Sequence, residues 1–200
     1  MLKIGITGGI GSGKTTVCRV FEILGIPVFN ADAEAKSIMV TDVSLIDSIK
    51  KEFGKESYFS NNELNRKYLA DRVFNNQEAL TILNGLVHPV TIKAFADWSL
   101  KQKSPYVIKE AAILIESGSY QDCDFVIVVT SPEDVRIKRV IDREGINEDS
   151  VRTRMSKQMP EEKKKELADF IIINDNKAAI IPQVLKLHEY FIDISRKRLL

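Results

Sequence analysis

The sequence predicts an α/β fold, a five-stranded parallel sheet with helices on both faces. Three short segments, 106–108, 125–129 and 170–173, are apolar without polar alternation, which is typical of strands buried on both faces. Two N-terminal segments, 3–7 and 27–29, have the same character. Helical stretches separate these segments, and strands that alternate with helices favour a doubly wound parallel sheet.

Composition and charge are those of an ordinary globular protein. The chain has 200 residues, 44% hydrophobic and 28% charged, enough for one domain that carries an insertion or a lid. Its 29 Lys and Arg against 28 Asp and Glu give a net charge of +1, so no overall field favours nucleic acid or membrane as a partner. Composition therefore names no partner, and any anion site must be local.

The same composition bears on the cellular compartment. No apolar run approaches the roughly 20 residues of a membrane span, and the N-terminus lacks a basic region before its apolar strand. Cys18 and Cys123 have no spacing for metal or redox chemistry. We expect reduced thiols and a soluble, cytoplasmic protein.

The turn after the first strand, Gly8–Thr15, matches the phosphate-loop pattern G-x-x-x-x-G-K-[ST] at every fixed position. A helical pattern follows it as far as Gly25. Backbone N–H groups and the helix N-terminus in such a loop bind phosphate. Lys14 would reach the β- and γ-phosphates, and Thr15 would coordinate Mg²⁺. The motif predicts a nucleoside triphosphate and Mg²⁺, with nucleotide bound by Gly11, Ser12, Gly13, Lys14, Thr15 and Thr16.

The segment between the second and third strands reads as a helical insertion, residues 32–103. Asp32 begins it at the carboxyl end of the second strand, the edge at which ligands bind in doubly wound folds. An aspartate at this position is either a helix N-cap or a base that accepts the proton of a substrate hydroxyl. The sequence leaves both interpretations open.

A charged region, 132–160, follows the fourth strand. Ser131 as a capping residue and Pro132 as the first helical residue predict a helix here, and a second helix is expected from about Asn147 to Met159. The first helix carries arginines at positions 136, 139 and 143, on one face. These arginines are either a solvated surface or a lid that neutralises a transferring phosphoryl group, the role expected of Arg139 and Arg143.

A regulatory GTPase, a nucleotide switch and not a metabolic enzyme, is the alternative outside the kinases. Its N-K-x-D signature is approached only by residues 176–179, which lack the aspartate. Its D-x-x-G signature occurs at 142–145, inside the arginine-bearing helix and not after a strand. A nucleic-acid motor would need a larger chain or a basic face. A kinase of small acceptors is favoured because the sequence offers an acceptor region, a base and a cationic lid.

Several short elements, in the same order, resemble those of the dephospho-coenzyme A kinase family over almost the whole length. They are the opening 5–16, Asn30–Asp32 with Ala35 (D-A-D-x-x-A), 86–89 (L-x-H-P), 113–116 (L-L-F-E), the lid 139–143, Arg154 with Gln158 (R-x-x-x-Q), and 168–174 (A-D-x-x-I-x-N). The resemblance implies ATP-dependent phosphorylation of the 3′-hydroxyl of the ribose of dephospho-coenzyme A, the final step of coenzyme A biosynthesis. A nucleoside monophosphate kinase is the alternative within this class.

The resemblance also implies roles for individual residues. The insertion would bind the coenzyme A moiety, with His88 and Glu116 among the substrate contacts. For His88 the alternative is an N–H donor that fixes a turn before Pro89. Glu110, where the family often has aspartate, would face Mg²⁺ through water.

Two further departures from the family pattern concern its fixed residues. Asn30 replaces the first aspartate of D-A-D, so Asp32 is the sole carboxylate for the base role. Ala112 replaces a proline.

Overall fold

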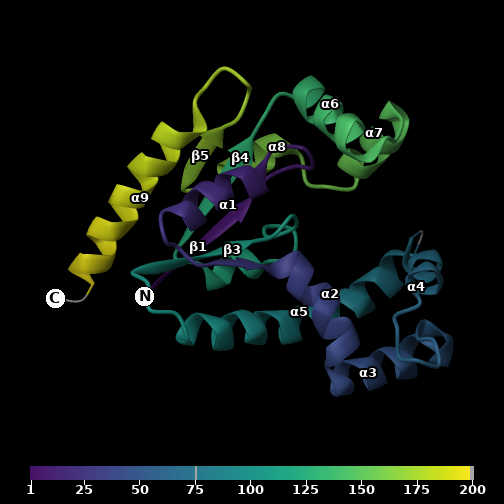
Figure 1. Ribbon diagram of the computed structural model, residues 1–200. Helices are drawn as coiled ribbons and strands as arrows, with labels where there is room; N and C mark the ends of the chain where they lie inside the picture. The colour runs from purple at the N-terminus through teal and green to yellow at the C-terminus, as the bar shows by residue number, and fades with distance from the viewer. Residues whose placement is uncertain (75, 199–200) are drawn as a thin grey trace. The chain divides into compact units, whose positions relative to one another are not determined.

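The computed structural model describes residues 1–74 and 76–198. The chain divides into two compact units. The first comprises the residues up to Asn30 and those from Lys101 onward, and the second comprises Ala31–Leu100. The first unit contains the sheet and the second is helical (Figure 1).

The first unit contains the predicted five-stranded parallel sheet. Its strands are β1 (Leu2–Thr7), β2 (Val28–Asn30), β3 (Tyr106–Glu110), β4 (Phe125–Thr130) and β5 (Phe170–Ile173). Their spatial order is β2-β3-β1-β4-β5, and each neighbouring pair is parallel. Because β1 lies between β3 and β4, the strand order reverses at its carboxyl end, the position at which doubly wound sheets bind ligands.

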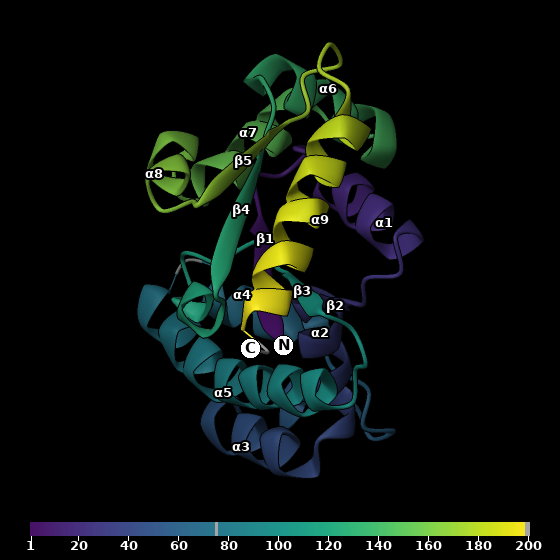
Figure 2. The ribbon, with the colours of Figure 1, turned by 90° about the vertical axis from the view of Figure 1, so that its left-hand side faces the viewer.

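Two helices cover one face of the sheet, α1 (Lys14–Ile23) and α9 (Ile180–Lys197) (Figures 1 and 2). Phe21 of α1 and Phe191 of α9 are fully buried against β-strand side chains. Phe191 also lies among the rings of Phe125, Phe170 and Tyr106, in contacts of 5.4 to 5.7 Å between centroids. Aromatic burial of this kind dominates the core energetics of small domains.

The opposite face packs against the segment that follows β3 and against a short helix. A Cβ added at Gly5 would lie 2.6 Å from Leu114 and 3.1 Å from Cys123, so the chain approaches the strand too closely for a side chain there. The segment contains the 3₁₀ helix η2 (Ser119–Asp122), and α8 (Glu161–Glu166) contacts β4.

The charged region forms two helices, α6 (Glu133–Glu144) and α7 (Glu148–Ser156). Asn147 caps α7 and accepts a hydrogen bond from the Ser150 N–H at 2.9 Å. The predicted start of α6 was wrong by one residue: Pro132 occupies the N-cap position, and Ser131 makes no capping bond. The Ser131 Oγ instead accepts from Arg139 Nη1 at 3.4 Å.

The second unit is a helical unit with its own core. Its elements are α2 (Ala31–Thr41), α3 (Val43–Phe53), η1 (Lys55–Ser57), α4 (Arg66–Val73) and α5 (Gln77–Leu100). Buried Ile38, Ile49 and Val87 bring α2, α3 and α5 together. The Tyr58 hydroxyl donates to the Met39 carbonyl at 2.7 Å, and its burial raises the pKa of Tyr58 to about 12.

Helix α5 differs from the sequence expectation, because it continues through Pro89. Proline has no N–H to donate to the carbonyl four residues earlier, which here belongs to Gly85. Gly85 lies in open surroundings, because a Cβ added there would meet nothing within 4 Å. His88 therefore lies inside a helix, and the alternative of a turn before Pro89 was wrong. By length and composition α5 is also the one helix of the described chain that could cross a membrane.

Candidate active site

The phosphate loop lies between β1 and α1, at the carboxyl edge of the sheet. Gly11 and Gly13 have φ angles of 78° and 90°, a left-handed conformation that favours glycine. Their surroundings also exclude a side chain, because an added Cβ would lie 2.5 Å from the Arg136 carbonyl at Gly11 and 2.1 Å from Asn174 Nδ2 at Gly13. The loop is therefore fixed in the curled shape that phosphate binding requires.

Helix α1 begins at Lys14, with Gly13 as its N-cap. The amides of Thr16 and Val17 both donate to the Gly13 carbonyl. The Lys14 ammonium returns over the loop and donates to the Gly8 carbonyl at 2.9 Å. Thr15 and Thr16 are exposed, and with Lys14 they lie at the N-terminus of a ten-residue helix, the end at which helices bind anions.

Glu110, at the end of β3, is an acidic residue in contact with this loop. It is 7% exposed. Its Oε1 accepts from the Thr15 hydroxyl and its Oε2 accepts from Asn30 Nδ2, each at 3.2 Å. A hydroxyl and a carboxylate beside a phosphate loop are the ligand types that Mg²⁺ takes together with substrate phosphates. The described residues contain no cluster of three or more His, Cys, Asp or Glu that could bind a metal by itself.

Asp32 lies in the first turn of α2, a half-buried residue inside the helix and not the residue before it. A carboxylate in the first turn interacts favourably with the helix dipole, by about 0.3–1 kcal/mol. Asp32 comes two residues after Asn30, whose side chain donates a hydrogen bond to Glu110. His88 lies in the same helical unit, half-buried in α5.

Arg139 connects α6 to the loop that follows β5. Its Nη2 donates to Asn174 O and Oδ1 at 3.1 Å and to Asn176 Oδ1 at 2.5 Å, and its Nη1 donates to the Gly11 carbonyl at 3.3 Å. Asn174 also donates to the Ser12 carbonyl at 2.7 Å. Arg139 thus lies directly beside the phosphate loop.

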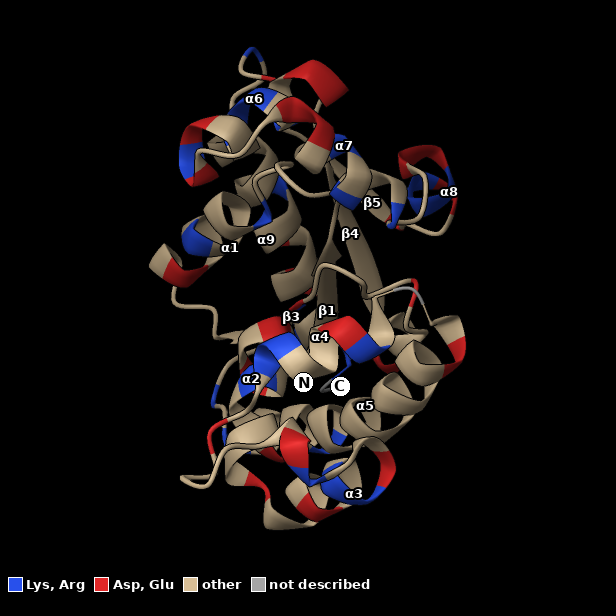
Figure 3. Cartoon of the chain, turned by 90° about the vertical axis from the view of Figure 1, so that its right-hand side faces the viewer, with Lys and Arg blue, Asp and Glu red and all other residues tan. Residues whose placement is uncertain are grey.

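Arg143 lies one turn farther along α6, and it is exposed. Its Nη2 donates to Glu144 Oε1 at 2.5 Å, and Arg154 Nη1 of α7 donates to Glu144 Oε2 at 2.5 Å. These guanidiniums, Arg143 first, lower the pKa of the Glu144 carboxyl. Figure 3 shows basic and acidic residues interspersed over α6 and α7.

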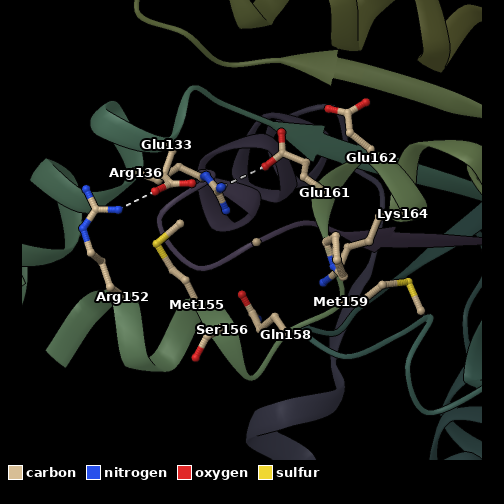
Figure 4. A pocket seen from close by; sticks show the side chains of 12 residues that line it. Glu133, Arg136, Arg152, Met155, Ser156, Gln158, Met159, Glu161, Glu162 and Lys164 are labelled. Atoms are coloured by element: carbon tan, nitrogen blue, oxygen red, sulfur yellow. Dashed lines mark hydrogen bonds and ion pairs between the residues drawn. The ribbon is translucent and has the colours of Figure 1, made fainter. Parts of the chain in front are cut away.

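Arg136 differs from its two neighbours on α6. It is buried, and its Nη2 lies 3.3 Å from Glu161 Oε2 in an ion pair drawn in Figure 4. A Cβ added at Gly9 would meet the Arg136 Nη1 at 2.2 Å. The Thr130 hydroxyl donates to the other oxygen of Glu161. Arg136 therefore supports the phosphate loop and is not part of a solvated arginine face.

A second buried ion pair anchors the segment between α7 and α8. The Lys164 Nζ is fully buried and lies 2.7 Å from Glu116 Oε1, in an ionic contact without an aligned hydrogen bond. The same oxygen accepts from the Met159 N–H at 3.1 Å. Gln158, the residue before Met159, accepts a hydrogen bond from the Ile10 N–H of the phosphate loop at 2.8 Å. Gln158, Met159 and Lys164 line a hollow of about 380 Å³, together with Arg136 and Glu161 (Figure 4).

Sequence reasoning missed Arg136 and Asn174 as contributors to the shape of the loop, and Lys164 as the buried partner of Glu116. Asn174 did appear in the family pattern, but without a role. Glu116, expected to contact substrate, has the contacts of an anchor. Both cysteines are free within the described residues. Burial raises the pKa of each, that of Cys123 to about 11, and Glu110 raises that of Cys18 further.

Comparisons with known sequences agree on one family. The sequence profile of the dephospho-CoA kinase family matches residues 2–179. A dephospho-CoA kinase of Bacteroides fragilis (strain YCH46) is 37% identical over 187 residues, 93% of this chain and 91% of that one. One from Salinibacter ruber is 39% identical over 178 residues, 88% of this chain and 89% of that one.

Comparisons with solved structures agree as well. A Thermus thermophilus protein has a TM-score of 0.84 at 30% identity, over 94% of this chain and 96% of that one. The dephospho-CoA kinase from Campylobacter jejuni has a TM-score of 0.69 at 28% identity, over 98% of both chains. A shikimate kinase from Acinetobacter baumannii, with a TM-score of 0.55 at 15% identity, shares the fold alone.

Proposed function

Because the chain belongs to the dephospho-coenzyme A kinase family, we propose how its residues divide the reaction among themselves. The enzyme transfers a phosphoryl group from ATP to the ribose 3′-hydroxyl of dephospho-coenzyme A, which gives coenzyme A in the final step of its biosynthesis. The observation that carries the proposal is the phosphate loop, with Lys14 folded over it and Glu110 beside Thr15.

The loop binds the phosphates of ATP through its backbone. The amides from Gly11 to Thr16 and the positive end of α1 surround the β- and γ-phosphates, and Lys14 moves from the Gly8 carbonyl to these oxygens. In transfer, negative charge spreads over the moving phosphoryl group, so a cation fixed beside it stabilises the transition state more than the ground state.

Thr15 and Glu110 fit the protein side of a magnesium site. The hydroxyl of Thr15 would coordinate the ion, and Glu110 would accept from its waters. These two residues would hold Mg²⁺ beside the phosphates, and the ion would supply positive charge that neutralises them. Asn30 donates a hydrogen bond to the second oxygen of Glu110. Because the Asn30 amide is neutral, it does not cancel the negative charge of the carboxylate.

Asp32 is the proposed base, and it accepts the proton of the 3′-hydroxyl as the new bond to phosphorus forms. The hydroxyl must lose this proton, because its pKa lies far above 7, and a carboxylate is a suitable acceptor. Position in the chain supports the assignment, since Asp32 follows the end of β2 at the carboxyl edge of the sheet. The helical unit after it binds the acceptor, with His88 as one contact.

Arg139 and Arg143 form the cationic lid over the transferring group. Arg139 already lies beside Gly11, and the Arg143 side chain is exposed to solvent. We still propose that Glu116 lies near the substrate. Its contacts with Lys164 and Met159 indicate that it acts by positioning the segment 158–164.

The partners proposed are small molecules alone, ATP and dephospho-coenzyme A, in the cytoplasm. A net charge of +1 supports the absence of nucleic acid or anionic membrane from this set. Helix α5 is apolar, and 17% of its most apolar 18-residue window is buried; Val87 and its neighbours pack into the core of the helical unit.

Mass spectrometry of the products tests the proposed function. The purified chain is incubated with ATP and Mg²⁺ and with dephospho-coenzyme A, AMP, CMP or shikimate as separate acceptors. We expect a mass gain of one phosphate on dephospho-coenzyme A, at the 3′-position. A gain confined to AMP or CMP would favour a nucleoside monophosphate kinase, and ATP binding without transfer would favour a nucleotide switch.

A further inference from the structure

Glu144 is the last residue of α6, and two arginines converge on it. Each carboxylate oxygen accepts from a different guanidinium, Oε1 from Arg143 and Oε2 from Arg154, both at 2.5 Å. Arg154 belongs to α7, so this one carboxylate joins the two helices of the lid. The cluster contains two positive charges and one negative charge, and therefore retains an excess positive charge.

Guanidinium groups recognise carboxylate and phosphate in the same way. Both anions accept parallel N–H donors, and arginine is favoured wherever either anion is bound. A phosphate group has more oxygens and more charge than a carboxylate, so it can bind both arginines at once and match their charge better. The Glu144 carboxylate therefore binds Arg143 and Arg154 as a phosphate would, but more weakly.

The contacts of Glu144 are also easily exchanged. The side chains of Arg143 and Arg154 are 62% and 51% exposed, and exposed ion pairs contribute little to stability. Breaking them for a better anion is therefore inexpensive for the fold. Arg136 shows the contrast, because its ion pair with Glu161 is buried beneath the phosphate loop.

We propose that Arg143 and Arg154 form a two-arginine phosphate clamp, and that the Glu144 carboxylate occupies this clamp until the phosphates of ATP displace it. The inference rests on the proposed function and adds two assignments to it. Arg154 becomes a second phosphate-binding arginine of the lid. Glu144 becomes an internal competitor, which keeps the arginines in place and lowers the affinity of the resting lid for free anions.

A matched control exists on the same two helices. Arg152 of α7 pairs with Glu133 and Glu148, so this cluster has one arginine and two carboxylates, the reverse of the Glu144 cluster. The variants Glu144→Gln and Glu148→Gln remove the same charge from the lid. Only the first releases Arg143 and Arg154.

The experiment measures dissociation constants for ATP and for inorganic tripolyphosphate by calorimetry, in wild type, Glu144→Gln and Glu148→Gln. We expect Glu144→Gln to bind both ligands about 3-fold more tightly, as the loss of a weak internal competitor implies. Glu148→Gln should stay close to wild type. Adding Arg154→Ala to Glu144→Gln should abolish the gain, and melting temperatures should remain unchanged in all variants.

Two results would overturn the inference. Equal tightening in Glu144→Gln and Glu148→Gln would show a general charge effect, and unchanged affinity in Glu144→Gln would make the Glu144 contacts purely structural. Either result is distinguishable from failure of the proposed function, because in both cases wild type would still convert dephospho-coenzyme A to coenzyme A.

Discussion

The buried pair of Lys164 and Glu116 offers a stability prediction with a calculable size. Lys164→Met removes a fully buried ammonium and leaves Glu116, 20% exposed, without its counter-ion. Removal of one partner of a buried pair costs about 3–5 kcal/mol. Since water reaches part of Glu116, we expect about 3 kcal/mol here. In a domain of this size, 1 kcal/mol corresponds to roughly 2–4 °C, so the melting temperature should fall by about 6–12 °C.

Differential scanning calorimetry of three variants checks this value. The double variant Lys164→Met, Glu116→Gln should recover most of the loss, because glutamine is neutral and its Oε1 can still accept from the Met159 N–H. The control is Lys165→Met, whose pair with Glu162 is exposed and is worth less than about 1 kcal/mol. Equal melting temperatures for Lys164→Met and Lys165→Met would refute the reasoning.

Two further predictions concern Asp32 and the cysteines. Asp32→Asn should lower kcat by roughly 10²- to 10⁴-fold, the usual contribution of a general base, with an ATP dissociation constant and melting temperature close to wild type; retained turnover in a steady-state assay would contradict the base role. Because burial raises the pKa of Cys18 and Cys123, both should react slowly with iodoacetamide at pH 8 until denaturant is added, the buried Cys18 more slowly than the half-buried Cys123; rapid labelling of Cys18 seen by mass spectrometry would contradict its burial.

The sheet was predictable because its strands are apolar runs, and β1, β3 and β4 are buried on both faces as expected. The expectation was wrong for β5, an edge strand whose Ile171 and Ile173 are exposed. The phosphate loop was predictable because its pattern and its place between strand and helix agree. Helix α5 was harder: Pro89 usually ends a helix, and only the structure shows the helix continuing past it. The start of α6 was misplaced because Ser131 and Pro132 both have residue types that begin helices.

The roles of the arginines could not be separated from sequence. Helical spacing places positions 136, 139 and 143 on one face of α6, but it does not say which part of that face meets the phosphate loop. Arg136 is buried because Glu161 lies opposite it, and Glu161 belongs to another helix far along the chain. Lys164 could not be singled out from sequence for the same reason, since its partner Glu116 follows β3.

The central claim is that the phosphate loop performs ATP-dependent transfer to dephospho-coenzyme A, and Lys14→Ala tests it most directly. Coenzyme A formation is followed by mass spectrometry in wild type and in the variant, with circular dichroism as the control for folding. Lys14 is half-buried at the start of α1, where alanine is well tolerated, so we expect an unchanged spectrum and a loss of turnover of about 10²-fold or more, the scale of one lost transition-state interaction. Coenzyme A formation at the wild-type rate by a folded Lys14→Ala variant would contradict the account.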